Sequence, residues 1–250
     1  MKLRRKLLLG RRRYERQTFQ TRNKKLQRYK KGSITALIVG DSGAGKTKLL
    51  GTLPPDSLII SLEKGLLSLK GGDIPYIQIP EGLDPKAKLD WLKSSMMWAS
   101  QQPYKNIAID SITEMSEFLV DFGKILYPAD NQIFKVYGQH KEQLTSSIKY
   151  CRDMNKNIFF TSLVKVDKDE IGRKVNLPAV AGSLSEELPK YFDFVFYLEV
   201  FEKDGEKKRA ILTDKKPDNK AKDRSGKLDE WEKPDLSNII NKVNGELTNV

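Results

Sequence analysis

The chain has 250 residues, of which 38% are hydrophobic and 31% are charged, and its formal net charge is +12. This apolar content suffices for one sizeable core, which excludes disorder throughout the chain. The single cysteine, Cys151, excludes a disulfide framework, and together with the single histidine, His140, it cannot supply a four-ligand zinc site. No apolar run approaches the roughly 20 residues of a membrane-spanning helix, so we expect no membrane partner.

The positive charge is concentrated at the start of the chain. Residues 1–31 contain 14 of the 45 Lys and Arg residues and a single acid, so the rest of the chain holds 31 basic and 32 acidic residues. We therefore predict a basic N-terminal arm, residues 1–33, attached to a nearly neutral globule. Cations of the arm would release counterions from a polyanion, and Tyr14, Phe19 and Tyr29 offer rings for base stacking. A solvated tail or a transit peptide is the alternative.

A phosphate-binding motif follows the first predicted strand. Residues 34–39 are short, continuous and apolar, as expected of a buried strand. The next eight residues, GDSGAGKT, match the pattern G-x-x-x-x-G-K-[ST], and a helix is predicted from Lys48 to Leu53. In this pattern Lys46 reaches the β- and γ-phosphates of ATP, and the Thr47 hydroxyl faces Mg²⁺. The whole motif, which we call the phosphate loop, is expected to contact the nucleotide: Gly40, Asp41, Ser42, Gly43, Ala44, Gly45, Lys46 and Thr47.

The rest of the chain alternates predicted strands and helices, which indicates an α/β fold with a mostly parallel sheet and helices on both faces. Strands are expected at 57–61, 76–79, 107–110 and 157–164, and helices at 86–101, 112–126 and 132–154. Residues 192–200 and 209–213 form a predicted late hairpin that turns at Asp204-Gly205 and gives the sheet an antiparallel edge. A loop is expected over 214–235, and a short closing helix over 235–244.

Two acidic residues are candidates for the chemistry at the phosphate loop. Asp110 ends the apolar strand 107–110, the position from which an acid holds the metal ion, although an Asp there can also simply cap the next helix. Hydrolysis further needs a group that orients or deprotonates water. Asp110 is followed by Ser111 and not by a glutamate, whereas Glu63 follows the strand 57–61. Some phosphate-loop ATPases place this glutamate beside the metal-binding acid, whereas those that resemble RecA place it after the strand that follows the first helix. Glu63 stands at this RecA-like position, and the resemblance assigns it to water activation; the alternative is an ordinary surface glutamate.

The ordered motifs of residues 34–226 resemble those of the phage RecA-like nucleotide-binding ATPases. The matching segments are the phosphate loop, Leu62-Glu63-Lys64-Gly65-Leu66, Ile107-Ala108-Ile109-Asp110-Ser111, Pro178-Ala179-Val180-Ala181-Gly182, Ser185-Glu186-Glu187-Leu188-Pro189, Asp193 and Ala221-Lys222-Asp223-Arg224. The resemblance implies a RecA-like ATPase domain over 34–226 and a C-terminal extension over 227–250. It also implies hydrolysis of ATP with Mg²⁺ by a phage-encoded protein in the bacterial cytoplasm.

The same resemblance implies macromolecular partners. Hydrolysis would occur between subunits of a homo-oligomer, with a cation from the neighbour stabilising charge on the γ-phosphate. Single-stranded DNA would contact the arm, residues 1–31, and a loop at 165–174, which has four cations and three acids and equally fits an ordinary hairpin. The candidate cations are Lys215, Lys216, Lys222 and Arg224, and Arg224 matches the family motif. With it, the expected catalytic set is Lys46, Glu63, Asp110 and Arg224.

Two other classes of function remain open on the sequence alone. The first is a small-molecule kinase with the same phosphate loop, against which the position of Glu63 argues. The second is a non-hydrolysing nucleotide-binding module that serves assembly. The presence of Lys46, Thr47, Asp110 and Glu63 argues against the second class without excluding it.

Overall fold

The computed structural model describes residues 33–63 and 66–246, so the basic arm, Lys64, Gly65 and residues 247–250 lie outside the description. The strands are β1 (Thr35–Val39), β2 (Ser57–Ser61), β3 (Tyr76–Gln78), β4 (Asn106–Asp110), β5 (Asn157–Ser162), β6 (Val164–Lys168), β7 (Lys174–Pro178), β8 (Phe194–Lys203), β9 (Glu206–Leu212), β10 (Lys222–Asp223) and β11 (Trp231–Glu232). The helices are α2 (Lys46–Leu50), α3 (Pro85–Gln101), α4 (Ile112–Leu126), α5 (Ile133–Arg152), α6 (Leu184–Glu187) and α7 (Leu236–Asn244), with 3₁₀ turns at Leu66–Leu69, Asp130–Gln132 and Leu188–Tyr191.

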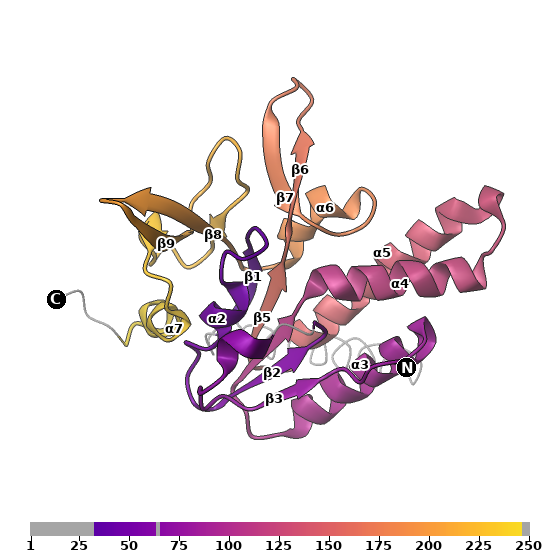
Figure 1. Ribbon diagram of the computed structural model, residues 1–250, viewed down its shortest axis with the longest axis horizontal. Coiled ribbons are helices and arrows are strands. Elements are labelled where there is room, and N and C mark those ends of the chain that lie inside the picture. Colours follow the sequence, from indigo (N-terminus) through magenta and orange to yellow (C-terminus); the bar gives the residue numbers. More distant parts are fainter. Residues whose placement is uncertain (1–32, 64–65, 247–250) are drawn as a thin grey trace, which may run out of the picture. The chain divides into compact units, whose positions relative to one another are not determined.

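Nine of the described strands form one large sheet in the order β11-β9-β8-β1-β5-β4-β2-β3, with β10 also paired to β8, and β6 and β7 form a separate two-stranded sheet (Figure 1). Strands β8, β1, β5, β4, β2 and β3 are mutually parallel, β9 and β10 run antiparallel to β8, and β11 runs antiparallel to β9. The predicted fold class is therefore confirmed, including the antiparallel edge. The turn predicted at Asp204-Gly205 is also confirmed, because both residues have a positive φ between β8 and β9.

Three predicted segments differ from the structure in the strands that they contain. The strand predicted over 157–164 ends at Ser162, where side-chain oxygens replace strand pairing: Thr113 Oγ1 accepts from the Leu163 amide and Ser162 Oγ accepts from the Ala179 amide. The chain then leaves the sheet as the hairpin β6–β7, so half of the expected loop 165–174 is strand, as the alternative of an ordinary hairpin predicted. The expected loop 214–235 contains the two-residue strands β10 and β11, which are too short for an alternating apolar pattern.

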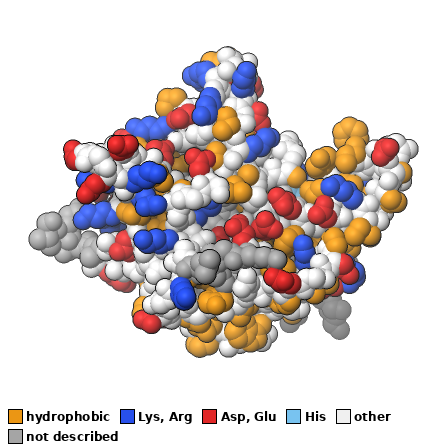
Figure 2. Space-filling model, in the orientation of Figure 1, with side chains coloured by type: hydrophobic (Ala, Val, Ile, Leu, Met, Phe, Trp, Pro, Cys, Tyr) orange, Lys and Arg blue, Asp and Glu red, His pale blue; other side chains and the backbone are white. Residues whose placement is uncertain are grey.

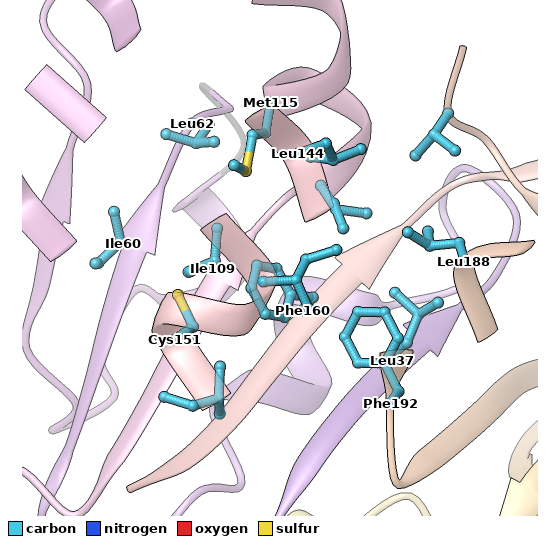
Figure 3. Close-up of a cluster of buried hydrophobic side chains, with 14 of the residues drawn as sticks. Leu37, Ile60, Leu62, Ile109, Met115, Leu144, Cys151, Phe160, Leu188 and Phe192 are labelled. Atoms are coloured by element: carbon cyan, nitrogen blue, oxygen red, sulfur yellow. The ribbon is translucent and has the colours of Figure 1, made fainter. Parts of the chain in front are cut away.

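The core has two layers, one on each face of the sheet. Alternate residues of β1 enter opposite layers: Leu37 belongs to the cluster that includes residues of α3, α4 and α5, whereas Ile38 belongs to the cluster that includes residues of α2 and α7. Figure 3 shows part of the first layer, in which the rings of Phe160 and Phe192 meet edge to face with centroids 5.6 Å apart. Burial on both faces explains why the central strands are continuously apolar. Helix α7 lies beyond the predicted boundary at 226 but packs into the same core.

The carboxyl ends of the parallel strands meet at one edge of the sheet, and this edge carries the phosphate loop. The hairpins β6–β7 and β8–β9 project from the same edge (Figure 1). Strand β1 pairs with β8 only as far as Tyr197, so the rest of β8 extends past the start of the loop together with β9. Among the described helices, none combines the length and the apolar character needed to cross a bilayer.

Candidate functional site

The phosphate loop has the backbone geometry of an anion cradle. Gly43 and Gly45 have φ values of 75° and 100°, a region that residues with a side chain rarely adopt. Gly40 is favoured for a different reason, since a Cβ at this position would lie 3.1 Å from the carbonyl oxygen of Leu198 in β8, closer than most Cβ contacts. The backbone conformation favours glycine at Gly43 and Gly45, and the close approach of β8 favours it at Gly40, as expected of a loop that wraps an anion with its backbone.

Lys46 is held over the loop and is surrounded by carboxylates. Its Nζ donates to the carbonyl oxygens of Gly40 at 2.8 Å and Asp41 at 2.9 Å. Burial lowers the pKa of the Lys46 ammonium, and the carboxylates of Glu63, Asp110 and Asp41 oppose that shift, Glu63 most strongly. The ammonium is therefore positioned where phosphate oxygens can replace the two carbonyls as its partners.

Thr47 and Asp110 are brought together although 63 residues separate them. Thr47 Oγ1 donates to Asp110 Oδ2 at 2.8 Å, and Thr161 Oγ1 donates to Asp110 Oδ1. Because β5 lies between β1 and β4, Thr161 at the end of β5 can hold the second oxygen of this buried carboxylate. A hydroxyl and a carboxylate suit Mg²⁺, which one or two protein oxygens bind together with phosphate oxygens and water.

Glu63 lies at the same edge, just after β2, the strand paired with the strand of Asp110. Strand β2 pairs with β4, and the Leu62 amide donates to the Asp110 carbonyl oxygen at 2.6 Å. The Glu63 carbonyl accepts from Ser61 Oγ at 2.8 Å and from Gln78 Nε2 at 3.3 Å, which fixes the backbone here. Its half-buried side chain borders a cleft of about 700 Å³ that Lys88 and Glu114 also line. The structure thus gathers Lys46, Thr47, Asp110 and Glu63 around the loop.

Comparison with known proteins agrees with this arrangement. A family model described as an AAA domain matches residues 33–225. The chain belongs to this AAA domain family. The family is of the P-loop NTPase type, which supports nucleotide binding and ATPase activity at the phosphate loop and the usual need for Mg²⁺. A search of the curated proteins found no match.

Lys222 and Arg224, two of the candidate cations, lie away from the phosphate loop of their own subunit. Strand β10 pairs with the first residues of β8, at the amino edge of the sheet, opposite the loop. Arg224 Nη1 donates to Asp193 Oδ1 at 2.9 Å, and Lys222 Nζ donates to the carbonyl oxygens of Pro189 and Phe192. Burial lowers the pKa of Lys222 to about 8. Arg224 and Lys222 are therefore not assembled with Lys46 and Glu63 within one subunit.

Lys215 and Lys216 follow β9 and differ in their contacts. Lys216 forms an ion pair with Glu230. For the Lys215 ammonium, the described part of the chain provides no hydrogen bond or ion pair, although the Lys215 amide donates to Asp214 at 2.7 Å. Lys216, Lys222 and Arg224 would each have to break a contact within the subunit to reach a neighbour's phosphate, whereas the described contacts would not hold Lys215 back.

Arg209 contacts the phosphate loop, although it was not predicted from the sequence to be a site residue. Its Nε donates to the carbonyl oxygen of Ala44 at 2.8 Å across 165 residues of sequence. The register of the hairpin, which sets Arg209 opposite Val200, carries this side chain back to the loop. A usable signal was present, because the predicted turn at Asp204-Gly205 implies that register.

His140 and Cys151 are core residues of the AAA domain. His140 Nε2 lies 2.7 Å from Ser116 Oγ, and burial lowers the pKa of His140 to about 4. Burial raises the pKa of the Cys151 thiol. Within residues 33–63 and 66–246, three or more His, Cys, Asp or Glu side chains nowhere form a cluster able to hold a metal ion.

Proposed function

We propose that this AAA protein is a Mg²⁺-dependent ATPase of the RecA-like type that acts on single-stranded DNA in phage-type recombination or replication. The observation that carries hydrolysis is the position of Glu63. It follows β2, the strand paired with the strand of Asp110, and its charge raises the pKa of the nearby Lys46 more than those of Asp110 and Asp41 do. A carboxylate beside the groups that hold the terminal phosphate and its metal is suited to activating water.

In the proposed reaction, Glu63 accepts a proton from a water molecule as the water oxygen attacks the γ-phosphorus. The bond between that phosphorus and the β–γ bridging oxygen breaks, and ADP leaves with the bonding electrons. Lys46 stabilises negative charge on the β- and γ-phosphates. Thr47 and Asp110 would hold Mg²⁺, which neutralises charge that develops on the phosphate oxygens.

For DNA binding, the hairpin β6–β7 supplies an exposed but nearly neutral surface. Figure 2 shows Lys and Arg side chains at the end of this hairpin. The hairpin also carries Val166 and Ile171, which are 56% and 72% exposed. However, Lys165 pairs with Asp167 and Arg173 pairs with Asp169, which offsets two of its cations. We therefore assign most of the attraction for phosphate to the basic arm and a contacting role to the hairpin.

The test is phosphate release from ATP with and without single-stranded DNA, at low and high salt, with no other phosphoryl acceptor present. Release that DNA stimulates supports the proposal. The cleft of about 700 Å³ beside Glu63 is the observation that favours a kinase as the second candidate, because an acceptor there would adjoin the γ-phosphate. Transfer to a metabolite without release to water would favour that candidate. Nucleotide binding without either reaction would favour an assembly module.

Deleting residues 1–31 is expected to leave phosphate release without DNA unchanged and to weaken DNA binding. The remaining chain has a net charge of −1, so it loses most of its long-range attraction for phosphate. If about five arm cations contact phosphates, the slope of log affinity against log salt falls by about 3.5 on single strands. The measurement is affinity against salt for both proteins on one oligonucleotide. Overlapping curves would show that the arm does not bind DNA.

Arg224→Ala is expected to lower phosphate release as a pure oligomer, because we assign Arg224 to the neighbour's γ-phosphate. Mixing Arg224→Ala with Lys46→Ala subunits should restore part of the activity, since some interfaces then pair an intact loop with an intact cation. Asp193→Asn is the matched control: it removes the same ion pair within the subunit but keeps the cation. Equal losses in Arg224→Ala and Asp193→Asn, or no rescue after confirmed subunit exchange, would contradict the assignment.

A further inference from the structure

A second cleft adjoins the phosphate loop, next to α2 and the hairpin β8–β9. Its volume is about 270 Å³, and its lining includes two cations and no acid. The walls come from the loop and one face of α2, from the hairpin and from the segment after β11: Gly45, Lys48, Leu49, Thr52, Leu198, Arg209 and Pro234. The cleft is therefore cationic and apolar, in contrast to the cleft beside Glu63, which two further glutamates line.

The order of the strands sets the direction in which a nucleotide would lie. From β1, the sheet continues through β5 to β4 and β2 on one side, and to β8 and β9 on the other. Asp110 and Glu63 follow β4 and β2, so the metal ion and the terminal phosphate belong on that side. The nucleoside end of an extended triphosphate then leaves the loop on the opposite side, where the second cleft lies.

Arg209 is held at the boundary between the loop and this cleft. Its Nε bond to Ala44 fixes the guanidinium against the loop, and a Cβ on Gly45 would lie 3.2 Å from that Nε. Among the described residues, the two Nη groups of Arg209 have no hydrogen-bond or ion-pair partner. A planar guanidinium fixed through one nitrogen can stack on an aromatic ring, which lysine cannot do in the same way.

We propose that Arg209 and this cleft bind the nucleoside end of the triphosphate, with the guanidinium against the face of the base. The proposal rests on the proposed function, in which the phosphate loop holds the phosphates. Arg209 would thus be a binding residue that favours nucleotides over simple polyphosphates. Its bond to Ala44 would make the position of the base depend on the conformation of the loop.

The experiment compares binding of ATP and of inorganic tripolyphosphate, each with Mg²⁺, by titration calorimetry. We expect Arg209→Ala to weaken ATP binding by about tenfold or more, the scale of one lost stacking contact, and to leave tripolyphosphate binding unchanged. Arg209→Lys should lose most of the ATP affinity that Arg209→Ala loses, because lysine keeps the positive charge but lacks the planar guanidinium. Lys207→Ala is the matched control, since it removes an exposed cation from the same face of β9 and should bind both ligands normally.

The outcomes separate this inference from the proposed function. If Lys46→Ala weakens binding of both ligands and Arg209→Ala weakens neither, the loop assignment stands and the role of Arg209 is wrong. Equal weakening of both ligands by Arg209→Ala would show that Arg209 acts on the phosphates or on the shape of the loop, which also overturns the inference. Full ATP affinity in Arg209→Lys would exclude stacking. If Lys46→Ala affects neither ligand, the proposed nucleotide site itself is wrong.

Discussion

Lys46→Ala is expected to abolish measurable phosphate release from ATP and to weaken nucleotide binding by about 10²-fold or more. Within the described residues around the loop, Lys46 is the side chain that places a cation directly over the cradle, where its Nζ now meets two backbone carbonyls. Without the ammonium, the negative charge of the β- and γ-phosphates would be stabilised by backbone groups and the metal alone. The measurements are steady-state phosphate release and equilibrium binding of ATP with Mg²⁺.

A control is needed because Lys46 is buried and its loss could alter the loop. The thermal midpoint and the circular dichroism spectrum of Lys46→Ala should match those of the unaltered protein. Lys124→Ala removes an exposed lysine at the end of α4, far along the chain from the loop, and should keep full activity. Normal turnover in a folded Lys46→Ala protein would show that the assignment of the active site is wrong.

Glu63→Gln is expected to keep ATP binding and to lower turnover by roughly 10²-fold or more, the usual scale for a lost general base. The amide has nearly the same shape as the carboxylate but cannot accept the proton of the attacking water. The backbone contacts of Glu63 with Ser61 and Gln78 do not involve the altered group, so the local fold should persist. A single-turnover measurement of hydrolysis, together with the affinity for ATP, separates the chemical step from binding.

Glu114→Gln distinguishes a specific base from a general electrostatic effect. Glu114 lines the same cleft as Glu63. Burial raises the pKa of the Glu114 carboxyl, and the negative charges of Glu117 and Glu63 raise it further. Replacing it removes a carboxylate from the same surroundings, and we expect turnover within about threefold of normal. If both variants lost activity equally, the effect would belong to the charge of the cleft and not to Glu63 as a base. Normal hydrolysis by Glu63→Gln would favour the kinase hypothesis.

The central strands and the phosphate loop were predictable because their signals are local. Residues 34–39 and 57–61 are short apolar runs, and they form strands buried on both faces, β1 and β2. The turn at Asp204-Gly205 was predictable because few residues adopt a positive φ readily. The sequence did not decide between a loop and the hairpin β6–β7, because each strand has only five residues, too few for alternation of polar and apolar side chains to exclude a loop.

By itself, the sequence determined the α/β class, the phosphate loop and the acids at the ends of two strands, since each depends on neighbouring residues and on the rule that parallel strands end at one edge. Only the tertiary structure decided which distant groups meet. Thr161 reaches Asp110 because β5 lies between β1 and β4, and Arg209 reaches Ala44 through the register of a hairpin. Arg224 contacts Asp193 at the opposite edge of the sheet. Strand order and register arise from packing of the whole core, and no local pattern encodes them.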